Sequence, residues 1–232
     1  MTITLLGQAG LYFKLENGVS FMLDPYLSDS LRQKEGECFA RRVPLDGKWL
    51  EKSVDMLLFT HDHADHFDME SVSPILDRED EVSVFAPYPV FLHVKERWNR
   101  KHPVTVMRPG VECTSHTVRI RTVHAYHETP DAVGYLIQTE GKNIYCSGDT
   151  LYNRLILQDV EDVPVDVAFV CINGKGNNMN AEDSARLMRL MHPTLVVPVH
   201  WDMFDSFGTD PLPFSQSLEN ICIVKAYQSI RL

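Results

Sequence analysis

Three histidines and three aspartates lie within ten consecutive positions of this chain, in the segment FTHDHADHFD at residues 59–68. Imidazole and carboxylate groups bind divalent metals, and aspartates crowded together without a cation or protons would repel one another. His61 and His63 are two positions apart and can share one side of an extended segment, whereas Asp65 and His66 follow where the chain must turn. We therefore predict a metal site with His61, His63, Asp65 and His66 as ligands.

Further candidate ligands follow three later apolar runs. RTVHAYHETPDAVGYLI contains His124 and His127, IYCSGDT contains Asp149, and LVVPVHWDMF contains His200. An aspartate in Ser-Gly-Asp-Thr can also simply cap a turn. The repetition of a donor after each apolar run favours metal binding, so remaining ligands are expected at these strand ends.

The elements that must position these donors are mostly short β-rich runs separated by turn signals, such as DMLLFT, VSVFA, VGYLIQT and TLVVPV. Helices are expected over residues 69–78 after an Asp68 cap, from Pro89 to about Trp98, and after Asn180. This order predicts a layered α/β domain with sheet packed on sheet and helices outside, formed as a single domain by residues 1–232. The polar residues 28–48 are either a solvated loop or a flap over a site.

The net charge and the cysteines limit the partners that the protein is expected to bind and the cellular compartment in which it is expected to occur. A net charge of −10 and a pI near 5.4 oppose binding to nucleic acids and acidic membranes. The five cysteines are scattered without a C-x-x-C pair, which predicts reduced thiols rather than disulfides or a thiolate zinc site. No apolar run approaches the length of a membrane span and the start lacks signal-peptide features, so a cytoplasmic protein is expected.

At this point the chain resembles the metallo-β-lactamase-fold metal-dependent hydrolases over nearly its whole length, and THDHADH carries most of the resemblance. AYHETPDAVGY, IYCSGDT and PVHWDMF are similar in particular to the branch that includes the L-ascorbate-6-phosphate lactonases. The resemblance implies an α/β fold, a four-layer αββα sandwich of two mixed sheets with outer helices.

The resemblance also implies two metal ions, zinc or manganese, with iron as a further option. One metal would be bound by His61, His63 and His127, a second by Asp65, His66 and His200, and Asp149 would bridge them. Two such cations lower the pKa of a shared water and stabilise developing oxyanion charge, so a metal-bound hydroxide would attack the substrate. Asp65 and Asp149 are predicted as catalytic residues. The leaving group would be stabilised by the second metal or protonated by a neighbouring acid such as Asp62 or Asp202.

Two interpretations of RTVHAYHE compete for the third ligand of the first metal. Period-two alternation through Val118, Ile120 and Thr122 puts His124 on their side of the strand and favours His124. A ligand should instead lie just past the strand end, where the chain can turn, and the family segment has its histidine at position 127. We predict His127 as the ligand and His124 as a packing or orienting residue.

The expected substrate is a small anionic metabolite with an ester, lactone or phosphodiester bond. Lys175, between Gly174 and Gly176, is predicted to bind its anionic group, although the same sequence suits a plain turn. The alternatives are an iron-dependent oxidoreductase or sulfur oxygenase on the same fold, and a non-catalytic metal-binding scaffold. The sequence does not indicate the substrate, the metal or the oligomeric state.

Overall fold

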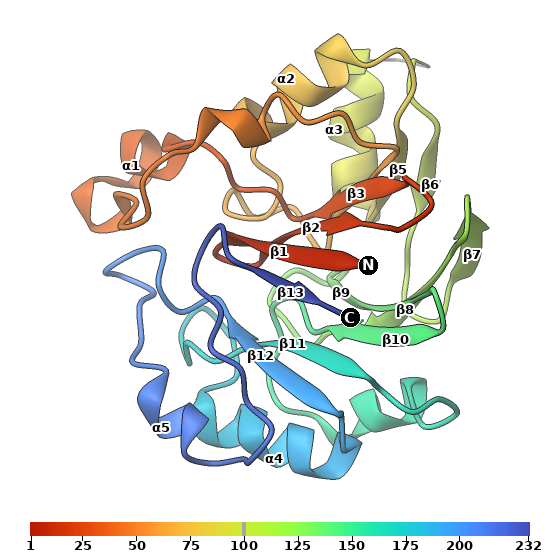
Figure 1. Cartoon of the computed structure of the whole chain (residues 1–232). Helices are drawn as coiled ribbons and strands as arrows, with labels where there is room; N and C mark the ends of the chain where they lie inside the picture. The colour runs from red at the N-terminus through yellow and green to blue at the C-terminus, as the bar shows by residue number, and fades with distance from the viewer. Residues whose placement is uncertain (99–100) are drawn as a thin grey trace. The chain divides into compact units, whose positions relative to one another are not determined.

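The computed structural model describes residues 1–98 and 101–232, which form two compact units (Figure 1). The first unit contains residues 1–107, 203–206 and 225–232, and the second contains residues 108–202 and 207–224. Each unit has its own β-sheet and hydrophobic core. The grouping of residues 1–232 into a single domain stays a prediction.

The first unit has a seven-stranded mixed sheet in the order β13-β1-β2-β3-β4-β5-β6. Its strands are β1 Thr2–Gly7, β2 Gly10–Lys14, β3 Ser20–Leu23, β4 Met56–Leu58, β5 Ser83–Ala86, β6 Val104–Val106 and β13 Ser229–Arg231. Neighbours from β13 to β3 are antiparallel, whereas β3, β4, β5 and β6 are parallel. The parallel strands therefore end at the same edge of this sheet.

The helices of the first unit are α1 Ser30–Glu35, α2 Met69–Arg78 and α3 Tyr88–Trp98. Helices over 69–78 and up to Trp98 are confirmed, and the Asp68 side chain accepts hydrogen bonds from the first-turn backbone of α2. Val72, Ile75 and Leu76 of α2 are fully buried, which contributes about 1.5–3 kcal/mol for each side chain. This burial holds the start of α2, and with it the preceding donor segment, against the unit's core.

Residues 28–48 are less irregular than the sequence suggests. They contain α1 and the short 3-10 helix Glu37–Phe39, and the 3-10 helix Gly47–Trp49 begins at their end. Arg41 donates to the carbonyls of Tyr26 and Ser28 and stacks over the Tyr26 ring. These contacts give Arg41 a structural role in anchoring the segment.

The second unit has a six-stranded mixed sheet in the order β12-β11-β10-β9-β8-β7. Its strands are β7 Glu112–Ser115, β8 Val118–His124, β9 Val133–Thr139, β10 Lys142–Cys146, β11 Val167–Cys171 and β12 Leu195–Val199. β10, β11 and β12 are parallel, and β8 runs in the same direction as β10 because both are antiparallel to β9. β8, β10, β11 and β12 thus end at one edge of this sheet.

The helices of the second unit are the 3-10 helix η3 Arg154–Asp159, α4 Ala181–Met191 and α5 Leu212–Ser215. The predicted Asn180 cap is confirmed, since its side chain accepts from the Asp183 backbone. The described residues include no helix with the length and hydrophobicity needed to cross a membrane. Two mixed sheets accompanied by helices confirm the predicted α/β class.

Candidate metal centre

The donor segment of the first unit begins where β4 ends. The three residues of β4 are fully buried, and β3 and β5 flank the strand on either side. Beyond it the chain makes a tight turn, in which the backbone N–H groups of His66 and Phe67 both donate to the His63 carbonyl. The turn compresses the segment between β4 and α2, so that donors close in sequence also gather in space.

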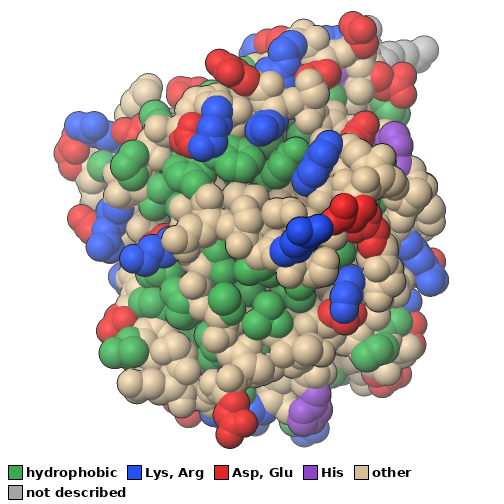
Figure 2. All heavy atoms as spheres, viewed as in Figure 1, with side chains coloured by type: hydrophobic (Ala, Val, Ile, Leu, Met, Phe, Trp, Pro, Cys, Tyr) green, Lys and Arg blue, Asp and Glu red, His purple; other side chains and the backbone are tan. Residues whose placement is uncertain are grey.

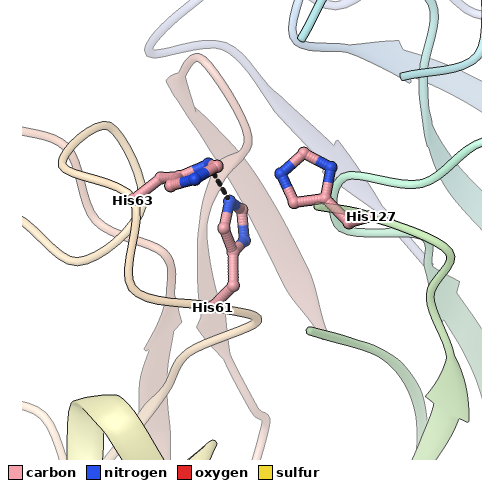
Figure 3. A group of neighbouring side chains, drawn as sticks. All are labelled: His61, His63 and His127. Carbon is pink, nitrogen blue, oxygen red and sulfur yellow. Dashed lines mark hydrogen bonds between the residues drawn. The ribbon is translucent and has the colours of Figure 1, made fainter. Parts of the chain in front are cut away.

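His61 and His63 lie with their ring nitrogens facing each other. The His61 Nε2 and His63 Nδ1 atoms are 3.0 Å apart, and a dashed line marks this contact in Figure 3. The other His61 nitrogen, Nδ1, is 3.0 Å from the Thr60 hydroxyl. His61 is buried and His63 is half-buried. Two imidazole nitrogens directed at one point are what a shared metal ion requires of its ligands.

Asp65 and His66 are each held by a second polar side chain of the same unit. The Gln8 amide donates to Asp65 Oδ2 at 2.6 Å, and the Asp24 carboxylate lies 2.8 Å from His66 Nδ1. His66 Nε2 is directed toward Asp65 Oδ2, with 3.7 Å between the atoms. A carboxylate that accepts from one imidazole nitrogen fixes the tautomer and leaves the other nitrogen as a metal ligand. Asp24 thus orients His66 in the way that the predicted coordination through Nε2 would require.

Asp24 and Gln8 are site residues that the sequence reasoning missed. Asp24 follows β3, is fully buried, and also accepts from the Thr60 backbone N–H at 2.8 Å. Both residues have positive φ, 43° for Asp24 and 53° for Gln8, which is uncommon outside glycine. A signal for Asp24 was present, because it is a carboxylate directly after an apolar run, like the predicted ligands. Gln8 lacked such a signal.

In the second unit, Asp149 and His200 meet at the edge where β10 and β12 end. Asp149 Oδ2 is 3.3 Å from His200 Nε2, and both residues are buried. The Asn178 amide donates to the same Asp149 oxygen at 2.8 Å. Buried carboxylate and imidazole groups in contact are suited to a cation, which offsets the cost of burying the carboxylate charge. Asn178 is a third site residue that the sequence reasoning missed.

His200 has a left-handed backbone, with φ of 61°. For a residue with a Cβ this conformation costs free energy and persists only where the surrounding structure enforces it. Trp201 contributes to that enforcement, since its indole N–H donates to the Pro198 carbonyl at 3.1 Å. The bend turns His200 out of the line of β12 and toward Asp149.

His127 and His124 have different surroundings in the second unit. His124, the last residue of β8, is exposed, and both its backbone N–H and its Nδ1 atom lie 2.8 Å from Asp159 Oδ2. His127, labelled in Figure 3, lies beyond the strand. Its Nδ1 atom is 3.4 Å from the Asn177 carbonyl. The burial alternation of β8 also breaks before His124, because Thr122 and Val123 are both buried. The period-two register of β8 itself continues to His124, but this histidine is engaged by Asp159. The assignment to His127 stays a prediction.

Lys175 lies on an exposed loop of the second unit, after β11. Gly174, Gly176 and Asn177 in this loop all have positive φ, and the Asn173 side chain donates to the Lys175 carbonyl at 3.2 Å. The Lys175 ammonium is 3.5 Å from the Gly208 carbonyl. The loop thus presents a cation on a backbone of defined conformation, and substrate binding by Lys175 stays a prediction.

The cysteines in the described residues are free thiols. Burial, and after it the nearby Asp149 charge, raise the pKa of the Cys171 thiol to about 11. At neutral pH Cys171 is therefore a neutral thiol, and its Sγ lies 3.8 Å from the Thr150 carbonyl. The groups of side chains able to hold a metal ion in the described residues contain histidine and aspartate and no cysteine.

Each of the seven predicted ligands belongs to a group of histidine and aspartate side chains able to hold a metal ion, namely His61, His63, Asp65, His66, His127, Asp149 and His200. Over residues 1–98 and 101–232, His124, Asp62 and Asp202 belong to none of these groups. Imidazole with carboxylate suits zinc, manganese and iron. The donor chemistry therefore fits the predicted metals.

Two mixed sheets with histidine and aspartate donors at their strand ends define a metallo-β-lactamase type of α/β protein. A family model described as the beta-lactamase superfamily domain matches residues 20–201, and the chain belongs to this family. The fold is shared with Igni18, a metallo hydrolase from Ignicoccus hospitalis, at a TM-score of 0.81 and 20% identity over 99% of this chain and 97% of that one. The predicted fold class is confirmed.

Sequence relatives extend over the whole chain. A UPF0173 metal-dependent hydrolase of Pyrococcus furiosus is 28% identical over 99% of both chains. Another from Anoxybacillus flavithermus is 28% identical over 93% of both chains. The chain is thus similar from end to end to proteins named as metal-dependent hydrolases, and the lactonase branch is not among the confirmed relationships.

Proposed function

We propose that this protein is a metal-dependent hydrolase that cleaves an ester, lactone or phosphodiester bond in a small anionic metabolite. The main supporting observation is that the predicted ligands are themselves held by hydrogen-bonding contacts. Asp24 contacts His66, Gln8 contacts Asp65 and Asn178 contacts Asp149. Side chains that only stabilise a fold do not need such orientation of their remaining donor atoms. Family membership and full-length similarity to metal-dependent hydrolases agree with this interpretation.

We assign one divalent ion to His61, His63 and His127, and a second to Asp65, His66 and His200, with Asp149 shared. When bound, two such ions lower the pKa of a water and stabilise developing oxyanion charge. Asp65 and Asp149, the two carboxylates of the set, would help to hold the ions and would balance part of their positive charge. The chain then needs no nucleophilic side chain, which agrees with the neutral Cys171 thiol.

Substrate recognition in this proposal depends on the loop after β11. Lys175 would hold an anionic group of the substrate through its ammonium. Asp62 or Asp202 would protonate the leaving group. A lactone is the first substrate class to test, because AYHETPDAVGY, IYCSGDT and PVHWDMF are similar to the lactonase branch.

The proposal includes a cytoplasmic location and a small-molecule rather than nucleic-acid substrate. Free cysteines, with Cys38 exposed, are typical of a reducing compartment. Lysine, arginine and acidic side chains are interspersed on the face shown in Figure 2. Such mixed charge, together with the net charge of −10, offers weak attraction to a long polyanion.

The test is reconstitution of the purified full chain with zinc, manganese or iron, followed by metal analysis and a screen of lactones, esters and phosphodiesters. We expect hydrolysis of at least one class by protein carrying two metal equivalents, and its loss in the His61→Ala/His63→Ala variant. Iron with redox-dependent absorption and oxygen consumption would favour the oxidoreductase instead. Bound metal without any turnover would favour the scaffold.

A further inference from the structure

A cavity of about 280 Å³ in the second unit is lined by three arginines. Its lining residues are Tyr152, Arg154, Arg186, Arg189 and Leu190. Arg154 is the first residue of η3, and Arg186 and Arg189 lie three positions apart on α4, so their side chains emerge on the same face of that helix. None of the five residues is a predicted metal ligand or substrate contact.

Within residues 1–98 and 101–232, the three guanidinium groups have no carboxylate partner. Arg186 stacks over the Tyr152 ring at 4.4 Å from the centroid, and Arg189 donates to the Ser217 carbonyl at 3.0 Å. In the described part of the chain, Arg154 and Arg186 form no salt bridge, and no acidic side chain lines the cavity. Like charges concentrated in this way repel each other unless an anion joins them. The chain as a whole has a net charge of −10, so a cavity lined by three arginines and no acidic residue is locally positive on an acidic protein.

A second cavity of about 270 Å³ adjoins the first, because Leu190 lines both. Its other lining residues are mainly apolar: Leu157, Val160, Val163 and Met191, with Glu161 as the single charged side chain. The two cavities together therefore offer a cationic part and an apolar part next to each other. Glu161 makes the apolar part unfavourable for a second anionic group.

We propose that this pair of cavities binds a small organic phosphate. The phosphate lies among Arg154, Arg186 and Arg189, and the apolar portion of the molecule lies against the residues around Leu190. Guanidinium groups bind phosphate oxygens through paired, charge-assisted hydrogen bonds, which suits the cationic part. Each cavity is close to the lower end of the roughly 300–1,000 Å³ that small-molecule sites occupy, so the ligand is a compact molecule rather than a peptide or a membrane surface.

The stacking of Arg186 on Tyr152 strengthens this assignment. The aromatic ring limits the freedom of the guanidinium before any ligand arrives, so less entropy is lost on binding. Removal of Arg186 should therefore weaken phosphate binding more than removal of an unstacked arginine elsewhere. Arg231, whose side chain is 81% exposed in the first unit, provides the matched control.

The experiment is calorimetric titration of the metal-loaded full chain with hexyl phosphate and with inorganic phosphate. We expect hexyl phosphate to bind, and Arg186→Gln to raise its Kd by about tenfold or more, the scale of one lost charge-assisted hydrogen bond. Arg231→Gln should leave the Kd within about twofold. Unchanged affinity in a folded Arg186→Gln protein would overturn the proposal, and Arg154→Gln repeats the test if Arg186→Gln does not fold.

Phosphate also binds metal ions, so the metal centre must be separated from this cavity. The His61→Ala/His63→Ala variant should retain hexyl phosphate binding, since the proposed site uses neither histidine. Loss of binding in that variant, with retention in both arginine variants, would assign the phosphate to the metals and overturn the proposal. Equal affinity for inorganic and hexyl phosphate would overturn the role of the apolar cavity.

Discussion

The two units supply their metal donors in different ways. In the first unit a single segment between β4 and α2 contains His61, His63, Asp65 and His66. In the second unit the donors follow three separate strands: His127 after β8, Asp149 after β10 and His200 after β12. The first arrangement is fixed by one local turn, whereas the second depends on the register of a whole sheet. The second set should therefore be more sensitive to changes in the surrounding structure.

Both sets nevertheless use the same kind of support. An amide holds one aspartate in each unit, Gln8 on Asp65 and Asn178 on Asp149. The first unit adds the Asp24 carboxylate behind His66. In both units, the donor side chains are therefore oriented by polar residues that lie outside the donor segments themselves.

The largest effect is expected from Asp149→Ala. A carboxylate shared by two cations binds each of them and reduces their mutual repulsion, so its removal should empty both metal positions. Metal analysis by mass spectrometry measures the loss directly. Asp162→Ala is the matched control, because Asp162 is an exposed carboxylate of the same unit that pairs with Arg121.

Loss of a single metal equivalent from a folded Asp149→Ala protein would contradict the bridging role. The His61→Ala/His63→Ala variant sharpens the contrast, since it should empty one position and leave the other filled. If both variants lost the same number of ions, the distinction between a shared donor and unshared donors would fail.

The next largest effect separates His127 from His124. We expect His127→Ala to lose one metal equivalent, because a ligand is removed, and His124→Ala to keep two, because His124 is engaged by Asp159. Circular dichroism checks that both variants fold. The opposite result, with His124→Ala losing metal and His127→Ala retaining it, would assign the ligand to His124.

The contrast between the units also explains what could be predicted from the sequence. The helix over 69–78 and its Asp68 cap were predictable, because helix caps and apolar spacing are local signals. The donor segment 59–68 was recognisable for the same reason. Assigning Asp149 to the site needed the repeated pattern of donors after strands, since an isolated Ser-Gly-Asp-Thr also suits a turn.

The residues that support the donors, Gln8 and Asn178, could not be predicted from local sequence patterns. Gln8 lies 57 positions from Asp65, and Asn178 lies 29 positions from Asp149. Neither residue type indicates a metal site by itself, and only the pairing of distant segments brings each amide to its carboxylate. The choice between His124 and His127 could not be settled by strand alternation, because the alternation does not reveal that Asp159, 35 positions away, holds His124.

A smaller effect is expected from Asp24→Asn. The carboxylate fixes the tautomer of His66, and an amide in its place can donate to Nδ1 and so favour the wrong tautomer. Metal affinity should fall by about 10–100-fold, the range typical of such supporting residues, and competition with a chelator measures it. Asn178→Ala tests the same principle in the second unit. Unchanged metal affinity in both variants would show that the ligands are oriented without these partners.

The smallest effect is expected from Lys175→Ala. A charge contact remote from the reacting bond is made in both the ground state and the transition state, so its loss should raise KM by about threefold to tenfold and leave kcat nearly unchanged. Steady-state kinetics with the anionic substrate found in the screen measure the split. Lys142→Ala is the matched control, because Lys142 is a lysine of the same unit at the start of β10, the opposite end of that strand from Asp149, and pairs with Asp166. An unchanged KM and kcat in a folded Lys175→Ala protein would show that Lys175 only forms part of a turn. A fall in kcat with constant KM would instead indicate that Lys175 acts in the transition state, and would weaken the contrast between metal donors and substrate contacts.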